Sequence, residues 1–290
     1  MISTQTSAAD SALESVIDLD AFPLDRPDGV ELRDLIAAAR CDLEATGCAC
    51  LLGFVQATAH AALSDETNQL APAAFKNSQH ITPYADLGGD AWPADHPRRR
   101  AGLMTNGFVG KDLIEDESMI KSIYRDERFK AFIAACLSLD ELHEFADPIR
   151  GLVVNVMDDG EQMPWHFDAN EFIVSLMTRR PEGGGRFDYC PNLREPGDER
   201  FEEVQNVLDG DESPAHSLDL QVGDLQIFKG RYSMHRVTPV EGSRHTVLFG
   251  YSEIPGYIGG VESTRIGYGR VTQAHLDAAA AGRHDDGLAG

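Results

Sequence analysis

The tetrapeptide Trp165-His166-Phe167-Asp168 constrains this chain more than any other feature of its sequence. In an extended strand, residues two apart point to the same face, so His166 and Asp168 project together. An imidazole and a carboxylate on one face are two of the ligands that a metal site needs. His235, in a later strand candidate, offers the third. The pattern therefore predicts a metal site that joins two distant strands of a β structure.

Two histidines and one carboxylate on one side of a metal, with open positions opposite, are typical of non-haem Fe(II) sites. Zinc is the rival metal. However, zinc hydrolases usually carry a helical His-Glu-x-x-His motif, which is absent from this sequence. Each residue taken alone could be structural. Together, His166, Asp168 and His235 favour an iron site.

Arg244 lies beside the apolar run that continues to Phe249, and Thr246 shares its face of the strand. A buried guanidinium needs an anionic partner. Its planar fork matches a carboxylate, and a threonine hydroxyl adds a further donor. A dicarboxylate cosubstrate would satisfy this need, and a structural ion pair is the alternative. Asn155 could add a hydrogen bond to the cosubstrate, although an ordinary, satisfied strand asparagine fits equally well.

Composition limits the partners of the chain. Lys and Arg number 25 against 48 Asp and Glu, a net charge of −23 that disfavours nucleic acid and anionic membranes. No apolar run is long enough to cross a bilayer, and the first residues do not resemble a secretory signal. The five cysteines form no CxxC pair and predict no disulfide framework. We expect a soluble, cytoplasmic protein, and nothing in the sequence indicates its oligomeric state.

The pattern along the chain predicts one domain over residues 1–290 in which helices precede a β core. Residues 1–14 are expected to be disordered, and residues 15–147 form a mainly helical part with helices near 28–46, 57–71 and 112–137. A long loop is expected over residues 77–110, and its basic stretch could be a lid over the substrate or a solvated turn. Residues 148–252 hold the β core, and residues 253–290 form a C-terminal extension with a short helix at 272–281.

The β core is predicted from short apolar segments separated by Gly, Pro and Asp, as in a barrel or sandwich. The expected strands span residues 150–157, 164–168, 171–178, 186–190, 215–221, 225–228, 233–240 and 244–252.

These motifs resemble those of the Fe(II)/2-oxoglutarate-dependent dioxygenases, whose pattern is His-x-Asp/Glu, a distal His, and an Arg followed by Ser or Thr. The resemblance implies an α+β fold with a double-stranded β-helix (jelly-roll, cupin-like) core over residues 148–252, buttressed by the N-terminal helices. It implies Fe(II), 2-oxoglutarate and O₂ as cofactors and cosubstrates. It further implies that Arg244 and Thr246 hold the distal carboxylate of 2-oxoglutarate.

Further stretches resemble bacterial oxygenases and halogenases that act on free amino acids. They are Trp165–Asp168, Gly183–Phe187, Tyr189–Arg194, Gly223–Arg231 and Ser233–Pro239. Halogenases of this kind carry Gly or Ala where Asp168 stands here, which leaves a coordination site for chloride. The carboxylate of Asp168 therefore favours hydroxylation, or desaturation or cyclisation from the same C–H abstraction, of an amino acid or its derivative.

Four residues are candidates for contact with a small polar substrate. Trp165 and Asn170 flank the metal ligands, Arg194 could hold a substrate carboxylate, and Arg231 precedes His235. Core packing of Trp165 and a local salt bridge of Arg194 are equally natural. Two alternatives to such an enzyme stay open: a cupin-like metal-binding module without turnover, and an oxygenase that acts on a basic peptide.

Overall fold

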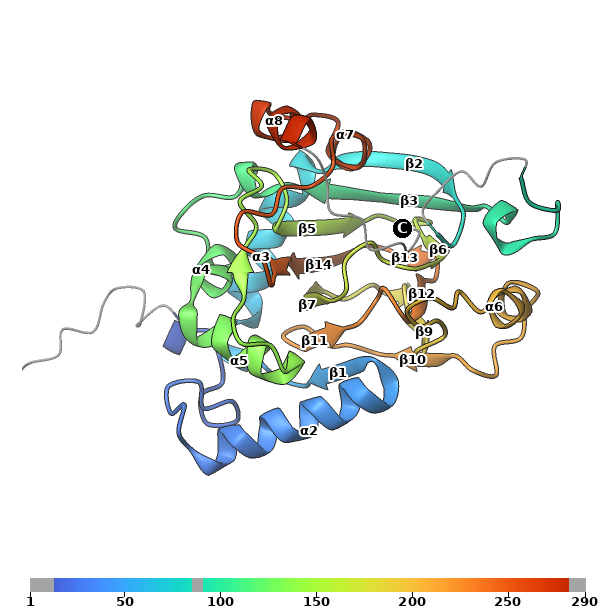
Figure 1. Cartoon of the computed structure of the whole chain (residues 1–290). Coiled ribbons are helices and arrows are strands. Elements are labelled where there is room, and N and C mark those ends of the chain that lie inside the picture. Colours follow the sequence, from blue (N-terminus) through green and yellow to red (C-terminus); the bar gives the residue numbers. More distant parts are fainter. Residues whose placement is uncertain (1–12, 85–90, 282–290) are drawn as a thin grey trace, which may run out of the picture.

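The computed structural model describes residues 13–84 and 91–281, and its framework is a pair of antiparallel sheets (Figure 1). The larger sheet has seven strands. In sheet order they are β1 (Cys48–Leu51), β11 (Leu225–Phe228), β7 (Ile173–Arg179), β14 (Arg244–Phe249), β5 (Leu152–Met157), β3 (Gly102–Val109) and β2 (Phe75–Ile81).

The smaller sheet has four strands and carries the motif around His166. In sheet order they are β10 (His216–Leu218), β9 (Phe187–Cys190), β12 (Met234–Val237) and β6 (Met163–His166). Two short antiparallel pairs complete the β structure: β13 (Val240–Glu241) with β8 (Gly183–Gly184), and β15 (Tyr251–Ser252) with β4 (His143–Glu144).

The helices lie in three parts of the chain: before β4, between β9 and β10, and after β15. The α-helices are α2 (Val30–Thr46), α3 (His60–Leu70), α4 (Met119–Arg125), α5 (Glu127–Leu137), α6 (Phe201–Leu208), α7 (Val261–Tyr268) and α8 (Gln273–Ala281). Short 3₁₀ turns are η1 (Ala57–Ala59), η2 (Ala71–Ala73), η3 (Pro97–Arg99) and η4 (Lys111–Leu113). In Figure 1, α2 runs below β1, while α7 and α8 lie above β2 at the other edge of the sheet.

The central strands of the larger sheet are covered on both faces, and β5 shows how. Leu152, Val154 and Val156 belong to the main hydrophobic core, which they share with residues of the N-terminal helices. Val153 and Asn155 point the other way, into a cavity that both sheets line. This is the alternation that a strand imposes on neighbouring side chains. The larger sheet therefore separates the hydrophobic core, which the N-terminal helices share, from the cavity.

These sheets and helices confirm the expected α+β class with a jelly-roll core. The helix near 28–46 is present as α2; Gly29 is its N-cap, and Gly47 ends it in the left-handed conformation (φ 70°). The helix expected near 112–137 is divided into α4 and α5 at Asp126, which caps α5 through the N–H groups of Arg128 and Phe129.

Several expectations were wrong. The expected loop 77–110 contains most of β2 and all of β3, which pair with each other and extend the larger sheet through β5. Their alternation is weak because β2 is largely exposed. The helix α7 was not expected either. Residues 143 and 144 form the short strand β4, and Ile17 forms a single bridge to Val55.

The disorder expected for residues 1–14 lies outside the described residues, apart from 13 and 14. Across the described ranges 13–84 and 91–281, every helix is too short or too polar to span a lipid bilayer.

Candidate metal centre and active site

The three predicted metal ligands meet at the edge of the smaller sheet. His166 ends β6, and His235 in β12 is its direct cross-strand partner. Asp168 follows β6 and turns back toward both rings. Its Oδ1 lies 3.6 Å from His235 Nε2 and 4.0 Å from His166 Nε2, and the three ligand atoms lie within 4.8 Å of one another. This spacing suits a single ion bound by all three.

Both imidazoles are held in the tautomer that a metal requires. His166 Nδ1 lies 2.7 Å from the carbonyl of Pro164, and His235 Nδ1 lies 3.0 Å from the carbonyl of Ser233. A carbonyl only accepts, so Nδ1 donates in each ring and Nε2 presents its lone pair to the site. Burial, reinforced by the neighbouring His235, lowers the pKa of His166 to about 4. His166 is therefore neutral and able to ligate at physiological pH.

The carboxylate of Asp168 is held in its ionised form and in a fixed place. Burial acts against ionisation, but His235, His166 and Arg194 together bring its pKa below the usual value. The Asp168 N–H donates to the carbonyl of Gly230 at 3.0 Å. A side chain at Gly230 would overlap with this carboxylate, since a Cβ there would lie 2.7 Å from Asp168 Cγ. Gly230 thus leaves just enough room for Asp168.

Arg244 lies in the same cavity as the metal ligands and is only 4% exposed. Its Nη1 donates to Thr246 Oγ1 at 2.7 Å, while its Nε is buried without a hydrogen-bond partner. No carboxylate among the described residues forms an ion pair with it. Burial lowers the pKa of Arg244 to about 10, so the guanidinium still carries its charge at neutral pH. A buried, charged donor without an anion fits a carboxylate-bearing cosubstrate.

Asn155 lies beside this pair, because it is the cross-strand partner of Thr246. Asn106 Nδ2 donates to Asn155 Oδ1 at 3.0 Å, and Asn155 Nδ2 lies 3.8 Å from Met163 Sδ. Asn155 is thus both a satisfied strand residue and part of the cavity wall, so the two interpretations of this residue are compatible.

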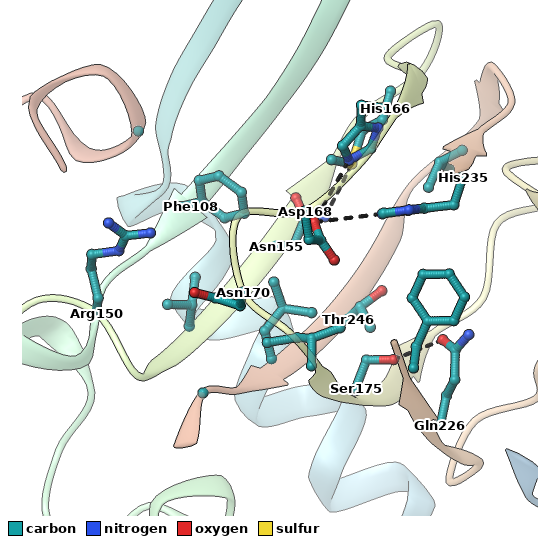
Figure 2. Close-up of a pocket in the computed structure, with 18 of the residues that line it drawn as sticks. Phe108, Arg150, Asn155, His166, Asp168, Asn170, Ser175, Gln226, His235 and Thr246 are labelled. Carbon is teal, nitrogen blue, oxygen red and sulfur yellow. Dashed lines mark hydrogen bonds and ion pairs between the residues drawn. The ribbon is translucent and has the colours of Figure 1, made fainter. Parts of the chain in front are cut away.

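The cavity has a volume of about 250 Å³, and the metal ligands and Arg244 all line it. Figure 2 shows the metal ligands on one side of it and Thr246 nearby. Asn170 lines it, as the sequence suggested. Trp165, Arg194 and Arg231 are not among its lining residues in the described part of the chain.

These three residues contact other parts of the protein. The guanidinium of Arg236 lies over the ring of Trp165, 4.6 Å from its centroid. Arg194 lies 4.1 Å from the ring centroid of Phe167 and forms a 2.8 Å ion pair with Glu199. Arg231 donates to the carbonyl of Ala169 at 2.8 Å. The salt bridge that competed with the substrate role of Arg194 is therefore present.

Sequence reasoning missed the far end of the cavity, which Phe108, Arg150 and Tyr268 line. Phe108 belongs to a segment expected to be a loop, and Tyr268 belongs to a helix that was not expected. Arg150 precedes β5 without any motif around it. Its position just before a fully buried strand was the only available signal.

The fold and the site together are those of the Fe(II)/2-oxoglutarate-dependent oxygenases, enzymes that use Fe(II), 2-oxoglutarate and O₂. A family model described as Halogenase D matches residues 32–254, so the chain belongs to this family. This confirms the predicted superfamily and an enzyme as the class of protein. A comparison with curated protein sequences gave no match.

Three solved structures illustrate the shared fold. AviO1 from Streptomyces viridochromogenes Tue57 is 16% identical, with a TM-score of 0.53 over 76% of this chain and 96% of that one. The epimerase SnoN, in complex with Fe3+, alpha ketoglutarate and nogalamycin RO, is 15% identical, with a TM-score of 0.51 over 76% and 84%. A prolyl hydroxylase from Trichoplax adhaerens, in complex with a peptide fragment, is 13% identical, with a TM-score of 0.50 over 79% and 96%. At these identities the likeness concerns the fold alone.

Proposed function

We propose that this protein hydroxylates an unactivated C–H bond of a small polar molecule, a free amino acid or an amino-acid derivative. Substrate, O₂ and 2-oxoglutarate are converted to alcohol, succinate and CO₂. One oxygen atom of O₂ enters the alcohol and the other enters succinate. The two-electron oxidation of the C–H bond and the oxidative decarboxylation of 2-oxoglutarate together supply the four electrons that reduce O₂.

The carboxylate of Asp168 is the observation that carries this proposal. The chain belongs to a family whose model is described as Halogenase D. The halogenases that its motifs resemble have Gly or Ala at this position. Here the Asp168 oxygen lies 3.6 Å from His235 Nε2, and Gly230 provides the space that the carboxylate needs. An anionic ligand at this position competes with chloride for the same place. Hydroxylation is therefore favoured over halogenation.

The roles of the other residues follow from the chemistry of their side chains. His166, Asp168 and His235 would hold Fe(II), which supplies the activation of O₂ when bound. Arg244 and Thr246 would bind the distal carboxylate of 2-oxoglutarate through charge-assisted hydrogen bonds. Asn155, fixed by Asn106, keeps the wall beside Thr246 rigid.

The size of the cavity supports a small substrate. At about 250 Å³ it lies just below the usual range for small-molecule sites, which begins at roughly 300 Å³. Desaturation and cyclisation are the alternatives on the same scaffold, since both begin with the same C–H abstraction. The mass of the product separates them, because only hydroxylation adds an oxygen atom.

The test is an anaerobic titration of the Fe(II)-loaded protein with 2-oxoglutarate. Binding is monitored through the weak visible charge-transfer band of the chelate. We expect the band in the wild type and a large rise in the 2-oxoglutarate concentration needed for it in Arg244→Gln. Arg180→Gln is the matched control, because Arg180 pairs with Asp219 at 2.6 Å on the surface. It should titrate like the wild type.

A wild-type protein that binds iron but gives no band would contradict the proposal and favour a cupin-like module without turnover. If the band forms, amino acids are added with O₂ in chloride buffer and the masses of the products are measured. A gain of one oxygen atom supports hydroxylation, and a chlorinated product would overturn it.

A further inference from the structure

The cavity extends beyond the metal ligands to a second cationic end. Arg150, Ser263 and Tyr268 line it there, and the last two belong to α7 of the C-terminal extension. In the view of Figure 2, Arg150 lies on one side, with Phe108 and Asn170 between it and Asp168. The function proposed above assigns nothing to this end.

The two cationic ends of the cavity are far apart. Arg244 pairs with Met157 at the end of β5, whereas Arg150 precedes the start of the same strand. At about 3.3 Å per residue, β5 alone spans roughly 16 Å from Leu152 to Met157. A five-carbon dicarboxylate bound to Arg244 is much shorter than this span. The Arg150 end is therefore left for another molecule.

The wall between the two ends changes from polar to apolar. Asn155 and Thr246 form one cross-strand pair near Arg244, and Val153 and Leu248 form the next pair toward Arg150. All four side chains line the cavity, as does Phe108. A molecule that occupies this stretch meets apolar side chains along its body and a guanidinium at its end.

The charge of Arg150 is not neutralised by an acid of the described residues. Its Nη1 donates to Ser263 Oγ at 3.1 Å. Burial raises the pKa of Tyr268 to about 12, although the positive charge of the nearby Arg150 lowers it.

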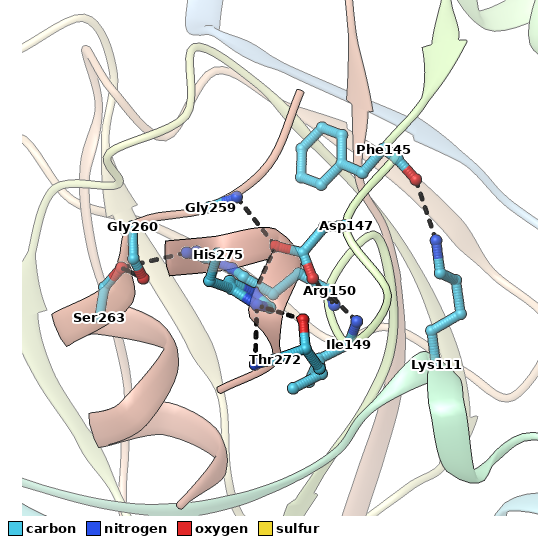
Figure 3. A network of polar contacts seen from close by, with 10 residues as sticks. All are labelled: Lys111, Phe145, Asp147, Ile149, Arg150, Gly259, Gly260, Ser263, Thr272 and His275. Atoms are coloured by element: carbon cyan, nitrogen blue, oxygen red, sulfur yellow. Dashed lines mark hydrogen bonds and ion pairs between the residues drawn. The ribbon is translucent and has the colours of Figure 1, made fainter. Parts of the chain in front are cut away.

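Asp147, the acid closest in sequence, is fully engaged elsewhere (Figure 3). Its Oδ1 accepts the N–H groups of Ile149 and Arg150, both at 2.8 Å. Its Oδ2 accepts the N–H of Gly259 at 2.8 Å and His275 Nε2 at 3.0 Å. Asp147 and His275 are both fully buried. Asp147 therefore fastens the C-terminal extension to the core instead of pairing with the Arg150 side chain.

This fastening also fixes the position of Arg150. Gly259 lies against the arginine side chain so closely that a Cβ there would be 2.6 Å from Arg150 Cδ. Arg150 is half-buried, held between Gly259 and Ser263. A guanidinium that is positioned before the ligand arrives loses little freedom on binding.

We propose that Arg150, assisted by Ser263 and Tyr268, binds the carboxylate of the substrate. The apolar body of the substrate then lies along Phe108, Val153 and Leu248, and its far end reaches the metal ligands. This inference rests on the proposed function and names the substrate class, a small carboxylate with an apolar body. Cationic groups are disfavoured at this end.

The test uses the Fe(II)–2-oxoglutarate charge-transfer band as a report of binding, without turnover. The probes are L-valine, L-leucine, L-isoleucine, L-methionine and L-phenylalanine, each beside its C-terminal amide. In the wild type we expect the acids to perturb the band at lower concentrations than the amides. Loss of a charge-assisted hydrogen bond weakens binding by about 10- to 100-fold.

Arg150→Gln should weaken binding of the acids by this factor and remove the difference between acid and amide. The band that 2-oxoglutarate itself produces should stay unchanged, which also shows that the variant is folded. Arg150→Lys should keep a weaker preference for acids, and Arg150→Glu should prefer the amides. Arg265→Gln is the matched control, because Arg265 lies on α7 but pairs with Glu262 at the surface. It should behave like the wild type.

The outcomes distinguish the two proposals. A normal band with equal binding of acids and amides, or with an acid preference that survives Arg150→Gln, overturns the role of Arg150 and leaves the proposed function intact. The role of Arg150 is overturned in the same way if no acid perturbs the band. Absence of the band itself contradicts the proposed function. In that case the role of Arg150 is tested by the shift in melting temperature that an acid or its amide causes in the metal-free protein. Equal shifts for acid and amide would overturn this role.

Discussion

Gly230 and Asp168 are packed so tightly that the carboxylate occupies the space where any other residue at 230 would place its Cβ. The same pair is joined by a backbone hydrogen bond of 3.0 Å from the Asp168 N–H to the Gly230 carbonyl. The third metal ligand is thus positioned by a residue that has no side chain.

Gly230→Ala should therefore weaken metal binding without removing a ligand. The methyl group displaces the Asp168 carboxylate, and loss of support for a ligand typically costs about 10- to 100-fold in metal affinity. Competition with a chelator measures the Fe(II) affinity. Gly267→Ala is the control, because its Cβ would make only an ordinary 3.8 Å contact with Phe108. Equal affinities of Gly230→Ala and the wild type would contradict the prediction.

Asp168→Gly should convert the anionic ligand position into one open to chloride. We expect chloride to perturb the charge-transfer band of the Fe(II)–2-oxoglutarate complex in this variant and to leave the wild-type band unchanged. The rate of hydroxylation should fall by more than about 100-fold, because removal of a metal ligand has a larger effect than removal of a residue that supports one. Asp168→Glu serves as the comparison that keeps the charge. A wild-type band that responds to chloride equally would show that Asp168 does not block the position.

His275→Ala should loosen the C-terminal extension. The substitution leaves Asp147 Oδ2 with one hydrogen bond fewer in a fully buried place, which costs about 1–3 kcal/mol in the free energy of unfolding. Urea unfolding measures this loss, and hydrogen exchange should increase in α7 and α8. Gln273→Ala is the control on the same helix, since Gln273 bonds Asp277 at the surface. Unchanged exchange in both helices would count against a fastening role of Asp147.

His245 should make the protein less stable in acid. Burial lowers its pKa to about 4; Arg179 and Lys76 act in the same direction and Asp158 acts against them. Between pH 6.5 and 4 the unfolded chain binds a proton at this residue and the folded chain does not. The neutral form of His245 thus makes its full contribution to the free energy of unfolding above pH 6.5. This contribution is lost as the pH falls toward 4, by roughly 3 kcal/mol at most. His245→Asn should unfold with a flatter pH dependence than the wild type in urea titrations of the metal-free protein. Parallel curves would contradict this assignment.

The rule that residues two apart in a strand share a face brought His166 and Asp168 together in the sequence analysis. The strand expected over 164–168 ends at His166, however, and Asp168 reaches the site from the segment that follows β6. The same rule placed Arg244 with Thr246, whose side chains do lie in one cavity. The pairing of His166 with His235 depends on the register of two distant strands; the sequence proposed His235 as the third ligand, and the resemblance to a known family supported it.

The far end of the cavity could not be predicted because it depends on tertiary contacts. Arg150 faces the cavity since Gly259 and Ser263, distant in sequence, close over it. The strand β2 was missed because an exposed edge strand lacks the alternation that marks a half-buried one. Its interior neighbour β3 is mostly half-buried or buried, but it has no regular alternation either. For Arg194 the sequence left a substrate contact and a local salt bridge open, and the structure shows the salt bridge to Glu199 together with the ring of Phe167.

The helices α7 and α8 lie beyond residues 32–254, the part of the chain that matches the family model. The metal ligands and Arg244 all lie inside that part, whereas Ser263 and Tyr268 lie outside it. Arg150, which the proposed substrate end requires, also lies inside that part. Exchange of the C-terminal tail would therefore alter only the side of this end that Ser263 and Tyr268 form, and would leave Arg150, Arg244 and the metal ligands in place.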